Sequence, residues 1–89
     1  MKNVDITIIN KLGLHARAAA KLVALASEFE SEVWLVREGK RVDATSIMAV
    51  MMLAAAQGTA LTVEAEGPDE SRAVESIAAL VDDRFGESE

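Results

Sequence analysis

The sequence predicts an α+β fold, with one four-stranded antiparallel sheet and three helices packed on one of its faces. Four segments alternate apolar and polar residues or carry β-branched runs, which is typical of strands. Three other segments repeat apolar residues at spacings of three and four, the pattern of an amphipathic helix. Their order along the chain is β-α-β-β-α-β-α. Helices on one face leave the opposite face to the polar residues of each alternating strand.

The first third of the chain predicts a strand, a loop and a helix. Val4, Ile6 and Ile8 alternate with polar residues and indicate a strand, which ends before a loop over residues 10–14. A helix is expected from Ala16 to about Ser27, because alanine is the best helix former and dominates this segment. Its apolar face is expected to consist of Ala19, Leu22, Val23, Ala26 and Phe29.

The middle of the chain predicts a hairpin followed by a short helix. Residues 32–38 contain a β-branched and aromatic run, which indicates a strand. Gly39-Lys40 is expected to form a tight turn into a short return strand over residues 41–44. Thr45 and Ser46 then precede the apolar run IMAVMML, which predicts a helix with a capped start.

The last third predicts one more strand and one more helix. Residues 60–66 alternate apolar and polar side chains, and residues 67–69 form a turn. Glu70 in the first turn suits the dipole of the helix that follows. The acidic tail after Phe85 is expected to be frayed. The apolar face of this helix is expected to consist of Ala73, Val74, Ile77, Leu80 and Val81.

Composition limits the classes of protein that fit. The 89 residues show no linker or repeat, so a single domain over residues 1–89 is expected. The chain has no cysteine and one histidine, so neither a metal site nor a cofactor is expected, and a reducing cytoplasm is the expected compartment. A net charge of −6 argues against nucleic-acid binding. The N-terminal segment lacks the long apolar stretch of a signal peptide or membrane span.

The single histidine, His15, stands at the predicted start of a helix and next but one to Arg17. Unpaired backbone N–H groups and the helix dipole make such a position electropositive, which favours a neutral, nucleophilic imidazole. The same surroundings bind anions, and the guanidinium of Arg17 suits phosphate oxygens. The alternative is a surface or capping histidine without chemistry. No serine, aspartate or cysteine nearby in the sequence supports a hydrolase triad.

The motif GLHAR followed by two alanines is the most specific feature of the chain. Together with the segments FESEV, GKRVDATSIMAVMML and QGTALTVEAEG, it resembles the HPr family, the histidine-containing phosphocarriers of the bacterial phosphoenolpyruvate-dependent phosphotransferase system. The resemblance covers nearly the whole chain. It implies the open-faced β-sandwich fold, which agrees with the order of elements above.

The resemblance also implies the chemistry of the site. His15 would accept a phosphoryl group on Nδ1 from phospho-enzyme I and pass it to a histidine of an EIIA-type protein. Ala16 and Arg17 would stabilise the phosphate through the helix-start amides and the guanidinium. Such a protein is a stoichiometric carrier rather than an enzyme, and it is expected to be a cytoplasmic monomer.

A regulatory site and a partner-binding face follow from the same resemblance. Ser46 would be phosphorylated by HPr kinase/phosphorylase, although Ser46 or Thr45 could equally serve only as a helix cap. A short helix on a sheet cannot bury every side of IMAVMM, and exposed methionines suit a surface that fits several partners. The expected partner contacts are Leu14, Ala20, Ile47, Met48 and Met51.

The chain departs from the family pattern at two positions near His15. Many members have proline at the place of Ala18, but a helix start does not need one. Leu12 is usually polar in sugar-pathway members and looks more like the nitrogen-related branch, NPr. The alternative function is therefore a regulatory interaction module of a nitrogen-related or incomplete phosphotransferase system. An acyl-carrier-like protein is disfavoured because its all-helical architecture does not fit the alternating strands.

Overall fold

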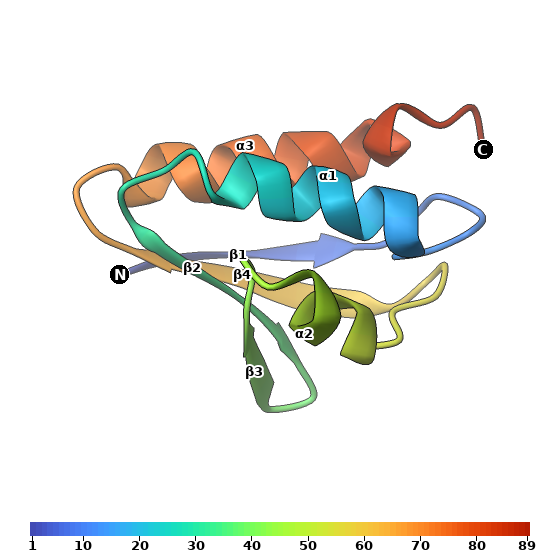
Figure 1. Ribbon diagram of the computed structural model, residues 1–89, viewed down its shortest axis with the longest axis horizontal. Coiled ribbons are helices and arrows are strands. Elements are labelled where there is room, and N and C mark those ends of the chain that lie inside the picture. Colours follow the sequence, from blue (N-terminus) through green and yellow to red (C-terminus); the bar gives the residue numbers. More distant parts are fainter.

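The structure is a computed structural model that describes residues 1–89, and its elements follow the predicted order (Figure 1). The strands are β1 (Lys2–Thr7), β2 (Glu32–Arg37), β3 (Lys40–Asp43) and β4 (Ala60–Glu66). The helices are α1 (Ala16–Ala26), α2 (Ile47–Met52) and α3 (Glu70–Asp82), followed by the single 3-10 turn η1 (Arg84–Gly86). The predicted α+β class is confirmed. No helix has the length and apolar character needed to cross a membrane.

The four strands form one antiparallel sheet in the order β1-β4-β2-β3. β1 runs along β4 from Lys2 opposite Ala65 to Thr7 opposite Ala60, so the first strand pairs with the last. Figure 1 shows α1 and α3 lying side by side along one face of this sheet. α2 contacts α1 and β3. The arrangement is the open-faced β-sandwich that the family resemblance implied.

The core is built almost wholly from aliphatic side chains. Its 21 buried residues include one aromatic residue, Phe85, which is 1% exposed. α1 buries alanines and one leucine, and small side chains allow its backbone to approach the sheet closely. Phe29 was predicted to lie on the apolar face of the helix. It instead lies beyond the end of α1 and is half-buried. The buried positions of α1 and α3 are Ala18, Ala19, Leu22, Ala26, Ala73, Val74, Ile77 and Val81.

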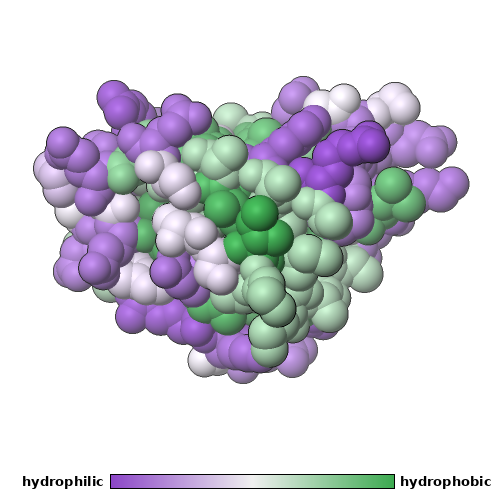
Figure 2. Space-filling view, viewed as in Figure 1, coloured by the Kyte–Doolittle hydropathy of each residue, from purple (hydrophilic) through white to green (hydrophobic).

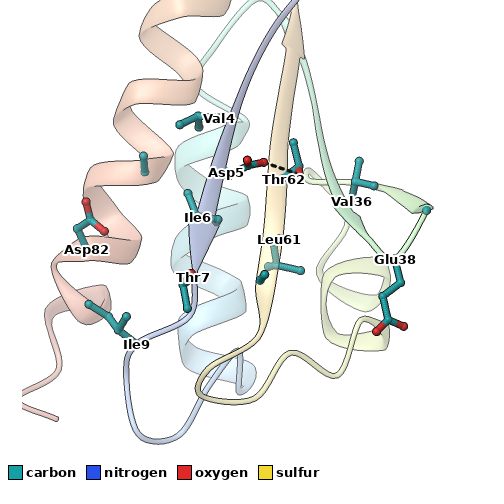
Figure 3. Close-up of a pocket in the computed structure, with 13 residues that line it drawn as sticks. Val4, Asp5, Ile6, Thr7, Ile9, Val36, Glu38, Leu61, Thr62 and Asp82 are labelled. Atoms are coloured by element: carbon teal, nitrogen blue, oxygen red, sulfur yellow. Dashed lines mark hydrogen bonds between the residues drawn. The ribbon is translucent and has the colours of Figure 1, made fainter.

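The opposite face of the sheet carries polar pairs between strands. The Thr62 hydroxyl donates to Asp5 Oδ1 at 2.9 Å, as Figure 3 shows. Arg41 pairs with Glu64 at 3.1 Å, and its guanidinium carbon lies 3.5 Å from the ring centroid of Trp34. A hollow of about 670 Å³ is lined mainly by residues of β1 and β4, with others from the β2–β3 hairpin and α3 (Figure 3). None of its lining residues belongs to the predicted site.

The hairpin turn lies one residue earlier than predicted. Arg37 pairs directly with Lys40, so the turn is Glu38-Gly39 and not Gly39-Lys40. Both turn residues have positive φ, 50° at Glu38 and 82° at Gly39. Type I′ hairpin turns, whose twist matches that of the strands, need positive φ at both positions, and glycine adopts it most easily. Lys40 therefore begins β3, which ends at Asp43.

The C-terminal tail is ordered, contrary to the predicted fraying. The ring of Phe85 is inside the core, and Lys21 Nζ donates to the Phe85 carbonyl oxygen at 2.6 Å. The backbone N–H of Lys11 donates to the carbonyl oxygen of Glu89 at 3.0 Å. Burial of a large apolar ring offsets the entropy lost by ordering a short tail. The tail consequently lies beside the loop that precedes α1 (Figure 1).

Candidate functional site

His15 is the N-cap residue of α1, so its predicted place at a helix start is confirmed. Its backbone is extended, with φ −72° and ψ 176°, and its carbonyl accepts the N–H of Ala19 at 2.8 Å. The imidazole makes no capping hydrogen bond to the helix and is 26% exposed. The ring is therefore available for contacts outside the helix.

The loop before His15 is fixed by a distant segment of the chain. Leu14 donates its N–H to the carbonyl oxygen of Ala55 at 2.9 Å, and its side chain is only 6% exposed. Gly13 has φ +69°, and a Cβ there would lie 2.7 Å from the same Ala55 oxygen. Only glycine fits this close approach without strain. The buried Asn10 amide adds a bond from Nδ2 to the Gly13 carbonyl oxygen at 2.8 Å.

Glu87 from the C-terminal tail contacts the imidazole. Its Oε2 atom is hydrogen bonded to His15 Nε2, and its Oε1 atom accepts from Asn10 Nδ2 at 3.1 Å. The bond with His15, aided by that with Asn10, holds the pKa of Glu87 below its usual range. The sequence around His15 indicates only positive groups in its surroundings. The structure adds a carboxylate, which favours a proton on Nε2.

The other ring nitrogen of His15, Nδ1, has no hydrogen-bond partner within the chain. The backbone N–H groups of Ala16 and Arg17 have no acceptor in the chain either, and the exposed guanidinium of Arg17 makes no ion pair. These donors share an open pocket of about 570 Å³ with the imidazole. Its lining residues are Lys11, Leu12, His15, Ala16, Arg17, Glu87, Ser88 and Glu89. An anion bound here would meet several unpaired donors.

Ser46 and Thr45 have different roles at the start of α2. Ser46 is the N-cap, and its Oγ accepts the N–H of Ala49 at 3.3 Å. Thr45 instead donates its hydroxyl to Asp43 Oδ1 at 2.6 Å, before the helix begins. Of the two capping alternatives left open by the sequence, the structure therefore selects Ser46. Its side chain is partly buried.

Apolar side chains are exposed on and beside α2, where Figure 2 shows them gathered over that part of the surface. Met48 is 75% exposed, and Ile47, Met51 and Met52 are exposed as well. Leu12, in the loop before His15, is 69% exposed. Neither Met52 nor Leu12 is among the partner contacts expected from the sequence. We define the apolar docking patch as Ile47, Met48, Met51 and Met52 of α2, whereas Leu12 lines the His15 pocket.

Two of the predicted partner contacts lie outside this patch. Ala20 is exposed on α1 and remains available to a partner. Leu14 belongs to the core and is only 6% exposed, so it offers little surface to a partner. The reason is the bond between the Leu14 N–H and Ala55, which turns the leucine inward while His15 stays at the surface. No cluster of three or more His, Asp or Glu side chains suited to a metal ion is present.

Fold and site together define a class of protein. One imidazole, with Nδ1 unengaged, stands at an unpaired helix start on an open-faced β-sandwich and beside an apolar patch. These features describe a small module with one ring nitrogen and several backbone N–H donors unpaired within the chain. The family model described as "PTS HPr component phosphorylation site" matches residues 2–83. The chain belongs to this family, the HPr phosphocarrier proteins of the phosphotransferase system.

Individual relatives agree with this assignment. The chain is 59% identical over 85 residues to "Phosphocarrier protein HPr" of Cupriavidus necator, which covers 96% of each chain. It is 46% identical over 84 residues to "Phosphocarrier protein NPr" of Shewanella violacea, covering 94% of this chain and 92% of the relative.

Solved structures show the same fold. The structure of HPr-C-His from Thermoanaerobacter tengcongensis matches with a TM-score of 0.96 and 45% identity over the whole of both chains. A structure described as an HPr dimer from the same organism matches with a TM-score of 0.78 and 46% identity, over 98% of this chain and 100% of the other.

Proposed function

We propose that this protein carries a phosphoryl group on Nδ1 of His15, taking it from phospho-enzyme I and giving it to a histidine of an EIIA-type protein. The observation that supports this most is the unengaged Nδ1 beside the unpaired amides of Ala16 and Arg17. The Nδ1 lone pair forms the new N–P bond while the donor histidine leaves with the electrons of the old one. The reverse events pass the group onward.

The electrostatics of the site suit a carrier. A helix N-terminus stabilises an anion by about 0.3–1 kcal/mol at an exposed position, and Arg17 adds a charged donor. Transfer between histidines breaks one N–P bond and forms another, so a stabilisation of about 1 kcal/mol shifts its equilibrium by less than tenfold and does not trap the phosphoryl group. Transfer in both directions therefore remains accessible. The protein is consumed and regenerated once per phosphoryl group, as a carrier and not as an enzyme.

The apolar docking patch and Ala20 would receive the two partners in turn. Methionine side chains are flexible and polarisable, so one surface fits differently shaped partners. We propose that the protein acts as a monomer, since an uncovered patch is needed at each step. Phosphoenolpyruvate is a cytoplasmic metabolite, and the proposal places the exchange in that compartment.

Ser46 is the proposed regulatory site, modified by HPr kinase/phosphorylase. Its partly buried hydroxyl caps α2 immediately before Ile47, at the edge of the apolar docking patch. A phosphate at a helix start is tolerated by the fold, but its charge would repel an acidic partner. Phosphorylation would thus weaken docking without unfolding α2. Incubation with the kinase and ATP tests this proposal, with Ser46→Ala and the exposed Ser71→Ala as matched variants.

Phosphorus NMR after incubation with phosphoenolpyruvate and enzyme I from the same organism tests the carrier function. The wild-type protein and Ser71→Ala, altered on the outer side of α3, are expected to give an acid-labile phosphohistidine signal. His15→Ala is expected to give none. Absence of the signal in the wild type, with enzyme I active on another HPr, would refute the carrier function.

That negative result would favour the alternative, a regulatory interaction module of a nitrogen-related or incomplete phosphotransferase system. The observation that favours this alternative is the exposed Leu12 in the His15 pocket, together with the similarity to an NPr protein. Binding of an EIIA-type protein that persists in His15→Ala would support it.

A further inference from the structure

Three side chains from separate parts of the sequence form a continuous hydrogen-bonded chain behind the proposed phosphorylation site. Asn10 Nδ2 donates to Glu87 Oε1 at 3.1 Å, and Glu87 Oε2 is bonded to His15 Nε2. Asn10 is fully buried, whereas the imidazole opens to the pocket. The carboxylate thus links a fixed amide to a reactive ring.

Glu87 is held from both sides by the fold. Phe85, two residues earlier, is inside the core, and Lys21 binds its carbonyl oxygen at 2.6 Å. Two residues later, the carbonyl oxygen of Glu89 accepts the N–H of Lys11 at 3.0 Å. The side chain of Glu87 is 17% exposed, against 71% for Glu89. A carboxylate with both oxygens bonded and both flanks anchored is a fixed partner for the ring.

The bond between Glu87 and Nε2 determines where the imidazole carries its proton. A carboxylate accepts hydrogen bonds and donates none, so the bond requires the proton on Nε2. A neutral ring then has its lone pair on Nδ1, the nitrogen without a partner in the chain. We infer that Glu87 is a positioning residue, which holds the proton on Nε2 and orients Nδ1 toward the phosphoryl donor. This inference rests on the proposed function.

The same carboxylate offsets the charge that the transfer creates. When the Nδ1 lone pair forms the N–P bond, the ring keeps its Nε2 proton and becomes cationic. Glu87 stabilises that cation, as a carboxylate stabilises the imidazolium of a hydrolytic triad. On onward transfer the electrons of the N–P bond return to Nδ1, and the ring is neutral again with its proton still on Nε2. Glu87 therefore acts in both directions without exchanging a proton with solvent.

Rapid-quench measurement of phosphoryl acceptance from phospho-enzyme I tests the inference, with Glu87→Gln beside the charge-matched control Glu75→Gln. Glu75 lies exposed on α3 and makes no ion pair. Loss of a charged hydrogen bond at this partly buried position is expected to slow acceptance by about tenfold in Glu87→Gln. The control is expected to match the wild type.

Nitrogen-15 NMR of the imidazole supplies a readout that a merely structural role would not change. The wild type is expected to show the proton on Nε2, and Glu87→Gln a mixture of the two neutral tautomers with circular dichroism unchanged. Equal acceptance rates and equal nitrogen shifts in the two proteins would overturn the inference. Faster acceptance by Glu87→Gln would also overturn it, because the carboxylate would then obstruct the ring. If the wild type accepted no phosphate, the proposed function would fail and the inference with it.

Discussion

Phe85 anchors the C-terminal tail, so its replacement by alanine tests both the core and the site. The phenylalanine ring is 1% exposed and is the only aromatic side chain among the buried core residues. Deleting it removes apolar contacts on the inner side of α1 and α3 and frees the segment that leads to Glu87. Two consequences are expected from one substitution.

The loss of stability follows from the size of the buried ring. Phenylalanine-to-alanine changes in cores cost about 3–5 kcal/mol, and the lower figure applies where the structure relaxes into the space. Phe85 lies at the end of the chain, where a short tail can move, so we expect about 3 kcal/mol. A domain of this length has a free energy of unfolding of about 4–13 kcal/mol. The expected fall in Tm is about 10–25 °C.

Urea unfolding followed by far-ultraviolet circular dichroism measures this free energy. Phe85→Leu, which keeps most of the apolar volume, is the matched control and should lose about 1 kcal/mol. Nitrogen-15 NMR of His15 should show that Nε2 has lost its fixed partner in Phe85→Ala. A change below about 1 kcal/mol in Phe85→Ala, with the His15 signals unaltered, would refute the reasoning that Phe85 anchors the tail.

Three further outcomes are expected, all measured by urea unfolding. Ser46→Ala removes the cap of α2 and should lower the free energy of unfolding by about 1 kcal/mol. Gly13→Ala should cost about 2 kcal/mol or more, because φ is +69° and the new Cβ would lie 2.7 Å from the Ala55 oxygen. The Ser31 hydroxyl donates to Asp69 and lowers the pKa of that carboxyl from 3.8. The pair therefore stabilises the fold above about pH 4, and this stabilisation is lost as the pH falls through the pKa that Asp69 has in the folded protein. Ser31→Ala should therefore reduce the fall in stability between neutral and acidic pH.

Each of these outcomes has a matched control. Thr45→Ala removes a hydroxyl that does not cap the helix. If it lowered the free energy of unfolding as much as Ser46→Ala does, the assignment of Ser46 as the cap would be contradicted. Gly39→Ala adds a Cβ that meets no atom within 4 Å, and it should cost less than the change at Gly13. For the pair of Ser31 and Asp69, Ser71→Ala is the control. The prediction would be contradicted if the free energy of unfolding fell equally with pH in Ser31→Ala and Ser71→Ala.

Local periodicity explains why most of the fold was predictable. The alternation in β1 and β4 and the apolar spacing in α1 and α3 each depend on residues close together in sequence. The hairpin turn was misplaced by one residue because Gly39 fits either turn position, and only the pairing of Arg37 with Lys40 decides between them. The frayed tail was predicted wrongly because the acidic composition of the segment hides the buried Phe85.

The site was predictable only in its local part. His15 at the start of α1, with Arg17 in the first turn, follows from the sequence of that helix alone. Glu87 is 72 residues away from His15, and nothing in its surroundings in the sequence marks it as a partner. The inward turn of Leu14 depends equally on Ala55, which lies on a distant loop. The positions of Glu87 and Leu14 depend on tertiary contacts between distant segments, which local sequence patterns do not indicate.

The pairing of β1 with β4 has a consequence for synthesis on the ribosome. β1 is made first, but its only neighbour in the sheet, β4, ends at Glu66. At about 5–20 residues per second, the partner is complete only about 3–12 s after β1. For that interval the alternating strand Lys2–Thr7 has no partner in its own chain.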